Sequence, residues 1–308
     1  MLRSLLLAAS RSATCRKLVE ALPPTRQIVD RFVAGTEVSQ AVEATSMLAS
    51  DRYVTLDHLG ESTTEPEQAE AIVGAYTQLL DLLSREGLSE RAEVSVKLSA
   101  VGGSLAADGK KIALDNARRI CEAASTAGTT VTLDMEDHTT TDDTLEIVRE
   151  LRADFPWVGA VLQAYLHRTE QDCRELSGPG SRVRLCKGAY TEPVSVAYQK
   201  KSEVDVSYVR CLKILMRGKG YPMVASHDPR LIAIAEDLAA RAGRKADDHE
   251  YQMLYGIRPK EQARIAASGR RMRVYVPYGS QWYDYFMRRL AERPANLMFF
   301  LRSLATTS

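Results

Sequence analysis

The chain has 308 residues, 45% of them hydrophobic and 26% charged, a composition typical of a globular protein with enough apolar side chains for a core. Its 41 basic and 40 acidic residues leave a net charge of +1, which gives no electrostatic footprint for nucleic acid or for an acidic membrane. The five cysteines are scattered without a Cys-x-x-Cys pair, so we expect reduced thiols in a cytoplasmic protein, and neither disulfides nor a zinc site.

Two helical patterns occupy the start of the chain. Met1–Ser10 contains an apolar run that is too short to span a membrane, and no clear cleavage site follows it, so we interpret it as a helix and not as a signal peptide. Further along, Thr25 is placed to begin a helix and Gly35 to separate that helix from the next. A peripheral position at the inner face of the cell membrane is the alternative to a wholly cytoplasmic one.

Eight short β-rich runs follow, separated by helical patterns. They are Tyr53–His58, Ala92–Leu98, Thr130–Glu136, Val158–Tyr165, Arg182–Gly188, Tyr221–His227, His249–Tyr255 and Met272–Pro277. This alternation predicts an α/β fold of the (β/α)8 TIM barrel type. A doubly wound open sheet is the alternative, but no Gly-x-Gly-x-x-Gly follows any of the runs. We expect a helical segment over 1–50 and a barrel domain over 51–308, with a final helix across the barrel mouth.

The helices between these runs are marked by their apolar period. Thr64-Glu-Pro-Glu67 predicts a capping-box start, and the apolar positions that follow recur at helical spacing until Gly87 ends the pattern. A weaker helical pattern follows Arg168. Similar helices are expected over 108–127, 139–154, 192–217, 228–242 and 258–269.

Nearly every β-rich run ends in a polar or ionisable side chain. These are Asp57, His58, Lys97, Asp134, Glu136, Gln163, Tyr165, Arg184, Lys187, Ser226, His227, Gln252, Tyr255 and Tyr275. Parallel strands buried on both faces are usually apolar, so Lys97, Asp134 and Arg184 need partners or a ligand. Because the carboxyl ends of barrel strands share one mouth, these side chains predict a polar pocket there.

The last helical pattern has two different faces at about 100° per residue. Its apolar face carries Tyr283, Phe286, Met287 and Leu290. Its other face carries Gln281, Tyr285, Arg288, Arg289 and Glu292. The second face is either solvated, with Glu292 pairing the arginines, or a clamp for a small anion.

Three chemistries compete for the pocket. Acidic and histidine side chains at the strand ends could bind a divalent metal, but the cations beside them oppose it, and we expect none. Lys187 or Lys97 could form a Schiff base. In the third, an anionic cofactor and an anionic substrate share a cationic mouth, with the turn at Lys187-Gly188-Ala189 approaching a phosphate and Arg184 under the reacting ring.

An ordered series of motifs resembles the proline dehydrogenase family. It consists of Leu133-Asp-Met-Glu136, Val161-Leu-Gln-Ala-Tyr165, Arg184-Leu-Cys-Lys-Gly-Ala-Tyr190, Ala225-Ser-His227, Tyr251-Gln-Met-Leu-Tyr-Gly256 and Tyr285-Phe-Met-Arg-Arg289. The resemblance implies a (β/α)8 barrel that holds FAD and oxidises L-proline to Δ1-pyrroline-5-carboxylate, with a quinone as electron acceptor. It also implies the monofunctional form, since the chain has no room for a fused aldehyde dehydrogenase.

The resemblance also assigns roles by position. Arg184 and Gln163 would contact the flavin ring, and Asp134 would orient the cationic side chains, so that Asp134 and Arg184 are the expected catalytic residues. The other expected cofactor contacts are Met135, Lys187, Gly188, Ala189, Ser226, His227 and Glu292. The expected substrate contacts are Lys97, Leu254, Tyr275, Tyr285, Arg288 and Arg289. Ser226 stands where the family often has Thr, and Cys186 where an aliphatic residue is common, a position where we expect packing and no redox chemistry.

Two other functions are compatible with the residues alone. A non-redox barrel enzyme could act on an anionic substrate through Lys187, and a non-catalytic protein could simply bind a small anion. A yellow colour in the purified protein would separate both from a flavoenzyme.

Overall fold

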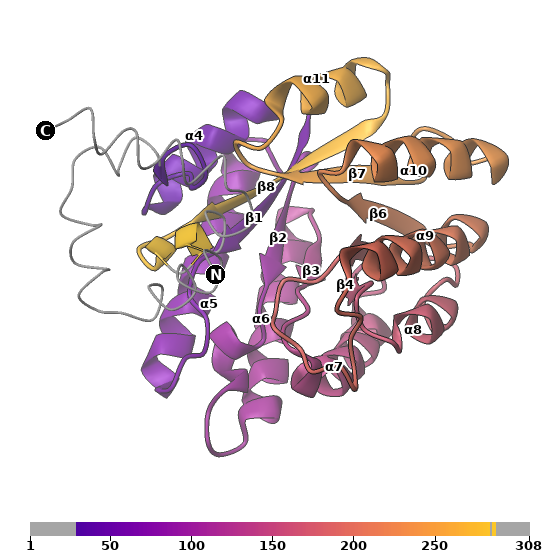
Figure 1. Ribbon diagram of the computed structural model, residues 1–308. Helices are drawn as coiled ribbons and strands as arrows, with labels where there is room; N and C mark the ends of the chain where they lie inside the picture. Colours follow the sequence, from indigo (N-terminus) through magenta and orange to yellow (C-terminus); the bar gives the residue numbers. More distant parts are fainter. Residues whose placement is uncertain (1–28, 284, 288–308) are drawn as a thin grey trace, which may run out of the picture.

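The computed structural model describes residues 29–283 and 285–287 of the chain. Within them, eight parallel strands close into a barrel with helices around the outside (Figure 1). The strands follow one another in chain order, and β1 (Tyr53–His58) completes the ring by pairing with β8 (Arg271–Tyr278). The predicted (β/α)8 barrel is confirmed.

The bounds of the other strands and of the described helices follow the predicted alternation closely. The strands are β2 (Ala92–Val96), β3 (Val131–Leu133), β4 (Gly159–Gln163), β5 (Arg182–Cys186), β6 (Tyr221–Ala225) and β7 (Glu250–Leu254). The helices are α4 (Val38–Leu48), α5 (Pro66–Arg85), α6 (Gly109–Ala127), α7 (Thr141–Asp154), α8 (Thr169–Glu175), α9 (Lys201–Arg217), α10 (Pro229–Arg241) and α11 (Pro259–Ala267).

Helix α5 illustrates how the local sequence determines a helix, and its first residues differ from the predicted ones. Its apolar positions are buried at helical spacing, as expected. The N-cap is Glu65, however, and the predicted capping box at Thr64 is wrong. Pro66 has a fixed φ that suits the first helical turn, so the helix begins there, and Gln68 accepts a hydrogen bond from the backbone of Thr64 over 3.1 Å.

The prediction of a helix over 192–217 is wrong in its first third, since α9 begins at Lys201. The preceding residues pair with the segment that follows β4. Tyr198 donates to the carbonyl of Tyr165 over 2.8 Å, and His167 donates to the carbonyl of Val196 over 2.9 Å. Tertiary pairing therefore overrides the helical pattern here.

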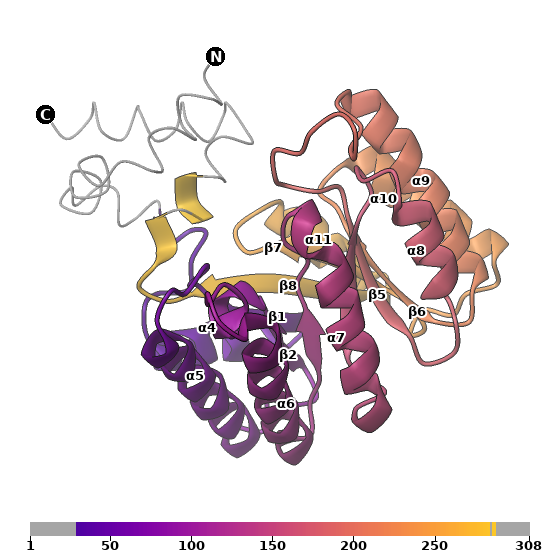
Figure 2. The same cartoon turned by 90° about the horizontal axis from the view of Figure 1, so that it is seen from below.

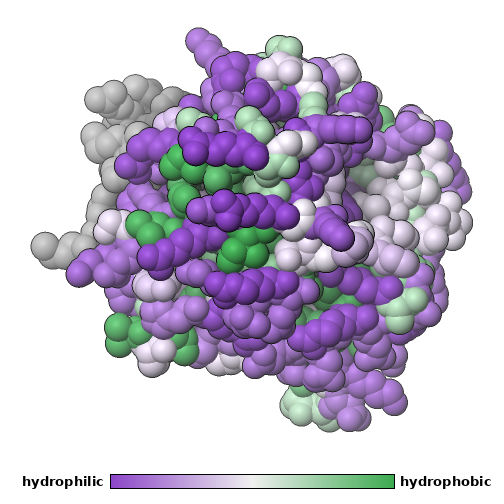
Figure 3. Space-filling view, turned by 90° about the vertical axis from the view of Figure 1, so that its right-hand side faces the viewer, coloured by the Kyte–Doolittle hydropathy of each residue, from purple (hydrophilic) through white to green (hydrophobic). Residues whose placement is uncertain are grey.

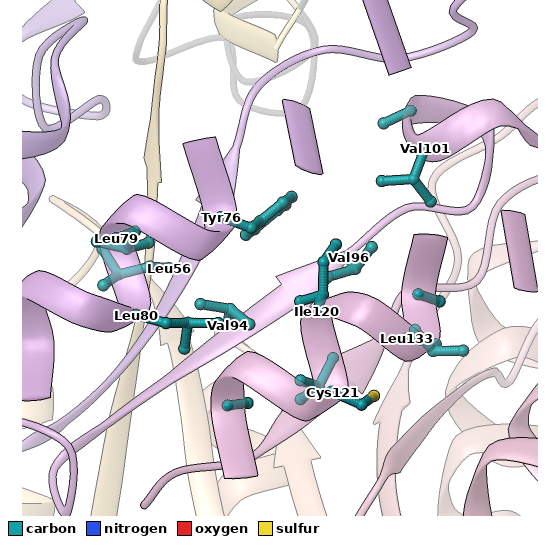
Figure 4. Close-up of a cluster of buried hydrophobic side chains, with 14 of the residues drawn as sticks. Leu56, Tyr76, Leu79, Leu80, Val94, Val96, Val101, Ile120, Cys121 and Leu133 are labelled. Atoms are coloured by element: carbon teal, nitrogen blue, oxygen red, sulfur yellow. The ribbon is translucent and has the colours of Figure 1, made fainter. Parts of the chain in front are cut away.

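The main apolar core lies between the strands and the surrounding helices. In Figure 4, Leu56, Val94 and Val96 from the strands meet side chains of α5 and α6, such as Tyr76 and Ile120. The outer face in Figure 3 is mostly hydrophilic, with small hydrophobic areas between long polar side chains. Figure 2 shows α5, α6 and α7 side by side along one flank of the barrel.

The inside of the barrel is polar at alternate positions. Successive strand residues point to opposite faces, so when Val54 and Leu56 face the helices, Thr55 and Asp57 face inward. The register sets Thr55 beside Glu93 and Asp57 beside Ser95. The closed sheet therefore brings polar side chains from several strands into one enclosed space.

A separate apolar cluster joins both ends of the described chain at the carboxyl end of the barrel. It contains Val29, Phe32, Val33, Leu59, Ile257, Tyr283, Tyr285, Phe286 and Met287. Leu59 and Ile257 lie just after β1 and β7, which places helical residues 282, 283 and 285–287 at the predicted mouth. Thr25 lies outside the described residues, and the division into 1–50 and 51–308 stays a prediction.

Candidate active site

Four side chains converge on the carboxylate of Asp134, just beyond β3. Arg184 from β5 donates to Oδ1 over 2.7 Å, and Ser95 from β2 donates to the same oxygen over 2.9 Å. Tyr275 from β8 donates to Oδ2 over 2.6 Å, and the ammonium of Lys97 lies 3.4 Å from that oxygen. Strands from different sides of the barrel therefore meet on one acidic side chain.

Lys97 also holds a second carboxylate, that of Asp57 at the end of β1, with 2.7 Å between Nζ and Oδ2. Burial acts to lower the pKa of Lys97, but the negative charge of Asp57 is foremost among the effects that outweigh it, so the pKa is raised and the side chain is an ammonium. Burial raises the pKa of Asp57 to about 6, against the opposing effect of Lys97. We call Asp57, Lys97, Asp134 and Tyr275 the mouth cluster.

A second charged group lies deeper in the barrel, and we call Glu93, Arg182, Glu250 and Arg273 the inner layer. Glu93 accepts a hydrogen bond from Arg182 over 2.6 Å. Glu250 accepts from two nitrogens of Arg273, over 2.7 and 3.1 Å. Burial acts to raise the pKa of Glu93, but its arginine neighbours, Arg273 first, outweigh it and hold the pKa well below its usual range.

Arg184 connects the two groups. Besides its bond to Asp134, its Nη2 lies 3.3 Å from Glu93, and its Nε donates to the Gln252 carbonyl oxygen over 2.6 Å. Gln252 in turn donates to Glu250 over 2.6 Å, so the hydrogen bonds determine which end of the amide faces the arginine. With 4% of its surface exposed, Arg184 is a fixed cation inside the barrel, directly below the mouth.

Lys187 lies apart from the mouth cluster and from Arg184, in a separate set of ion pairs. Its ammonium lies 2.5 Å from Asp205 in α9 and 3.4 Å from Asp228 before α10. Lys187 directly follows β5 and is an odd number of positions after Arg184, so extended-chain alternation sends the two side chains to opposite sides.

Two further cations contact the same carboxylates as Lys187. Lys201 lies 2.7 Å from Asp205, and Arg230 lies 3.1 Å from Asp228. Three cations against two carboxylates make this cluster, beside the ends of β5 and β6, positive overall. Its composition suits an anionic group such as a phosphate.

Neither alternative chemistry gains support from this geometry. Among residues 29–283 and 285–287, no group of three or more His, Cys, Asp or Glu side chains is arranged to hold a metal ion. Lys97 lies between two carboxylates, and its raised pKa favours the ammonium form over the neutral amine that a Schiff base requires. Lys187 is held in ion pairs with Asp205 and Asp228. In the described part of the chain, no helix has both the length and the apolar character to cross a membrane.

Comparison with known proteins decides the family. The family model described as proline dehydrogenase matches residues 41–302. Proline dehydrogenase 1 of Bacillus subtilis (strain 168) is 37% identical over 305 residues, 99% of each chain. The proline dehydrogenase of Deinococcus radiodurans is 40% identical over 280 residues, 90% of each chain.

The chain belongs to the proline dehydrogenase family.

A solved structure agrees with this assignment. Proline utilization A from Bdellovibrio bacteriovorus, in a crystal structure of the protein inactivated by N-propargylglycine, superimposes with a TM-score of 0.79 at 27% identity. The match covers 86% of this chain and 32% of that one, so this chain spans about a third of the larger protein's length. As a proline dehydrogenase, the chain oxidises proline to Δ1-pyrroline-5-carboxylate and depends on FAD.

The residues expected to hold FAD lie around the ends of β3 to β6. Gln163 is buried and donates to the carbonyl of Glu136 over 2.7 Å. Met135 and Ser226 are buried at the ends of their strands. His227 accepts a hydrogen bond from the backbone of Leu254 over 2.9 Å, which fixes the orientation of its ring.

The turn after β5 packs closely against the ring of Tyr165. Gly188 has a φ of 111°, a conformation that side chains rarely adopt. A Cβ there would meet the Tyr165 ring at 2.3 Å, so only glycine leaves room. With the positive cluster around Lys187 on one side and buried Arg184 on the other, the residues present fit an anionic dinucleotide.

The residues expected to hold proline are only partly within the described chain. Lys97 and Tyr275 lie in the mouth cluster, and Leu254 ends β7. Tyr285 is 6% exposed within the apolar cluster that also contains Phe286, so its side chain is not solvated. The remaining expected proline contacts, Arg288 and Arg289, lie outside the described residues, as does the expected cofactor contact Glu292.

Sequence reasoning missed the inner layer. Its residues lie at or near the starts of their strands, whereas the functional residues predicted from the sequence lie at the strand ends. A signal was present, because Glu93, Ser95 and Lys97 alternate with apolar residues, a period of two that marks one polar face of a strand.

Proposed function

We propose that the mouth cluster, together with Arg184, is the site where proline is oxidised. The observation that carries this proposal is the convergence of Lys97, Arg184 and Tyr275 on Asp134 at the carboxyl end of the barrel. Barrel enzymes keep their chemistry at this end. Two buried cations there suit a substrate that carries a carboxylate.

In this proposal the substrate carboxylate is held by Lys97, Arg288 and Arg289, and the apolar ring by Leu254, Tyr275 and Tyr285. The two arginines follow Met287 directly in the sequence, and Met287 is buried at the carboxyl end of the barrel. Asp134 holds Lys97 and Arg184 in place through its two oxygens. Its pKa is below the ordinary value because Lys97 and Arg184 outweigh the effect of burial, so it stays ionised while doing so.

The cofactor contacts divide into two groups. Arg184 and Gln163 would hold the flavin ring, with Met135 packed close. Lys187, Gly188, Ala189, Ser226, His227 and Glu292 would hold the rest of FAD. When bound, FAD supplies a hydride acceptor. Arg184 is needed beside it because a fixed buried cation favours the negative charge that reduction adds.

For the electron acceptor we propose a quinone, and for the location a cytoplasmic protein that meets the inner face of the membrane only when it delivers electrons. The support is the family resemblance together with the absence of any membrane-crossing helix in the described residues. The test is to mix anaerobically reduced protein with a soluble short-chain quinone and to follow reappearance of the flavin absorption. A quinone that fails to reoxidise the flavin contradicts the proposal.

The site proposal is tested with Arg184→Lys and Arg184→Ala. We expect a folded protein with low flavin content or slow anaerobic bleaching of the flavin by proline, with Lys intermediate because it keeps the charge but loses the forked donors. The matched control is Arg85→Ala, which removes an exposed arginine that pairs with Asp81 over 2.9 Å on α5. Full flavin content and a wild-type reduction rate in Arg184→Ala would exclude Arg184 from the site.

Substrate recognition is tested by competition. If cations hold the carboxylate, tetrahydrofuran-2-carboxylate, which lacks the amine, should inhibit, and pyrrolidine, which lacks the carboxylate, should not. Loss of either Arg288 or Arg289 should weaken the inhibitor by roughly 10- to 150-fold, since each supplies a charge-assisted hydrogen bond of about 1.5–3 kcal/mol. Equal binding of the two small molecules would show that the arginines form only a solvated helix face.

A further inference from the structure

Asp57 differs from the other buried carboxylates of the barrel in how few partners it has. It is 1% exposed, and its Oδ2 accepts from Lys97 over 2.7 Å. Its Oδ1 is buried and has no hydrogen-bond partner among the described residues. Asp134, by comparison, has four donors on its two oxygens. A buried carboxylate oxygen without a donor is costly, so its retention requires an explanation.

Among the residues that the structure describes, the ion-paired side chains inside the barrel balance in charge only when Asp57 is ionised. The cations are Lys97, Arg182, Arg184 and Arg273, and the carboxylates are Asp57, Glu93, Asp134 and Glu250. A proton on Asp57 would leave the interior with one excess positive charge. The carboxylate of a bound substrate supplies the matching negative charge, so a protonated Asp57 is tolerated when the site is filled.

We propose that Asp57 holds the proton that the substrate ammonium must lose before a hydride can leave, and that Lys97 relays it. This inference rests on the proposed function, which places Lys97 beside the substrate. An N–H bond of Lys97 breaks as an O–H bond forms on Asp57 Oδ2, and the Lys97 nitrogen takes a proton from the substrate nitrogen. Lys97 ends as the ammonium that it was, no electrons are transferred, and the substrate nitrogen keeps a lone pair.

Among Asp57 and the groups that face it, Asp57 is the one whose pKa lies near neutral pH. Burial raises the pKa of Asp57 to about 6, so it is a carboxylate and can accept a proton at neutral pH. Burial, then Lys97, lowers the pKa of neighbouring His58, which therefore stays uncharged. Tyr76 and Tyr278 face Asp57 from α5 and β8, and burial raises the pKa of both hydroxyls.

Two other charged neighbours complete the surroundings. Asp134 acts on Asp57 as a like charge, and its own pKa is lowered, chiefly by Lys97 against the effect of burial. Glu61 acts on Lys97 and favours its ammonium form. Tyr275 also faces Asp57, and its pKa is raised by burial. Of these groups, Asp57 is the one placed to gain and lose a proton near neutral pH.

The experiment uses FAD-loaded protein and compares Asp57→Asn, which keeps the shape but cannot take the proton, with wild type. The rate of anaerobic flavin reduction by saturating proline is measured between about pH 5 and about pH 8. Wild type should show a rate that rises with pH as Asp57 loses its proton. Asp57→Asn should be about 100-fold slower or more and should lack that rise.

The second readout is the affinity for tetrahydrofuran-2-carboxylate, measured by the change in the flavin spectrum. This molecule has no ammonium proton to lose, so Asp57→Asn should bind it nearly as tightly as wild type does. Asp57→Glu should recover part of the reduction rate and the rise with pH. Asp81→Asn, which changes an exposed aspartate on α5, is the control and should match wild type.

Two results would overturn the proposal. One is a wild-type rate and pH profile in Asp57→Asn. The other is a loss of analogue affinity that matches the loss of rate, which would mean that Asp57 only positions Lys97. If Asp57→Asn does not fold, Asp57→Ala, which also lacks the titrating group, carries the same two readouts. Failure of the proposed function gives a different result, since Lys97→Met would then leave both the rate and the analogue affinity unchanged.

Discussion

The inner layer and the mouth cluster are built from the same kinds of charged residues, yet their bonding differs. In the inner layer, Glu93 is bound by Arg182 and Arg184 and also accepts from Thr55, and Glu250 accepts twice from Arg273. In the mouth cluster, Lys97 reaches Asp134 and Tyr275 only over 3.4 and 3.5 Å, and Oδ1 of Asp57 accepts no hydrogen bond from the described residues. The carboxylates of the inner layer are therefore more fully paired than Asp57 within the part of the chain that the structure describes.

This difference separates charge used for structure from charge used for chemistry. A fully paired buried network holds one arrangement, and removing any member leaves an uncompensated charge. An incompletely paired cluster can exchange a partner for a substrate group or a proton. Arg184 bonds to one member of each, so the inner layer helps to set the position of the cation that we propose contacts the flavin ring.

The largest effect is expected for Glu93→Gln. It removes the carboxylate that pairs with Arg182 and one of the two carboxylates that pair with Arg184 and with Arg273. This loss should lower the free energy of unfolding by about 3–5 kcal/mol. Chemical denaturation of the holoenzyme measures the change. If Glu93→Gln unfolds at the same denaturant concentration as wild type, the inner layer is not a structural network and the comparison fails.

The next effect concerns pH and Asp57. Its pKa in the folded protein is raised to about 6, so the native state binds more protons than the unfolded state between about pH 4 and about pH 6. Its contribution to stability is therefore fully present below its unfolded pKa and is lost as pH rises through its folded pKa. The stability of wild type relative to Asp57→Asn should fall by on the order of 2–3 kcal/mol from about pH 4 to about pH 7.

Thermal unfolding at several pH values measures this difference. Asp57→Ala should give the same slope, because it also lacks the titrating group. A difference between wild type and Asp57→Asn that does not change with pH would show that Asp57 titrates alike in the folded and unfolded states.

Lys97→Met should cost less stability than Glu93→Gln, about 1–3 kcal/mol. Without Lys97 the pKa of Asp57 should rise further and the side chain should take up a proton, so that no uncompensated charge stays buried. Flavin reduction by proline should nevertheless be strongly impaired. A loss of stability as large as that of Glu93→Gln would mean that the mouth cluster is as structural as the inner layer.

The smallest effect is expected at the surface. Arg119 holds both oxygens of Glu70 over 2.6 and 2.7 Å, a geometry as good as any in the inner layer. Both side chains are exposed, so water and salt replace the interaction when Glu70→Gln removes it. The denaturation midpoint should hardly move, and a shift comparable to that of Glu93→Gln would show that burial is not what distinguishes the inner layer.

The sequence was informative wherever a signal is local. The strand positions, the buried stripe of α5 and the polar residues after the strands follow from periods of two and of 3.6 and from the turn residues. The hydrogen-bond partners of those residues cannot be predicted from these local patterns. Arg184 and Gln252 meet across 68 positions of sequence, and Arg184 and Glu93 across 91, because closing the barrel decides which inward side chains share a level.

The same limit applies to the surroundings of Lys187 and Tyr285. The sequence does not show that Lys187 pairs with Asp205 in α9 and with Asp228 before α10. Helical angle alone does not show that residues 29–33 and the segments after β1 and β7 pack against the helix that carries Tyr285. The segments that pack against a residue cannot be inferred from the sequence around that residue alone.

The pairing of β1 with β8 has a consequence for how the protein is made. Tyr53 lies beside Arg273 in the closed barrel, although about 220 residues separate them in the chain. At roughly 5–20 residues per second, a ribosome needs about ten to forty seconds to add the intervening residues. During that interval β1 has one free edge, an open template for pairing with another nascent chain. We expect synthesis at high temperature or high expression to give aggregates, and co-expressed chaperones that shield nascent strands to improve the yield.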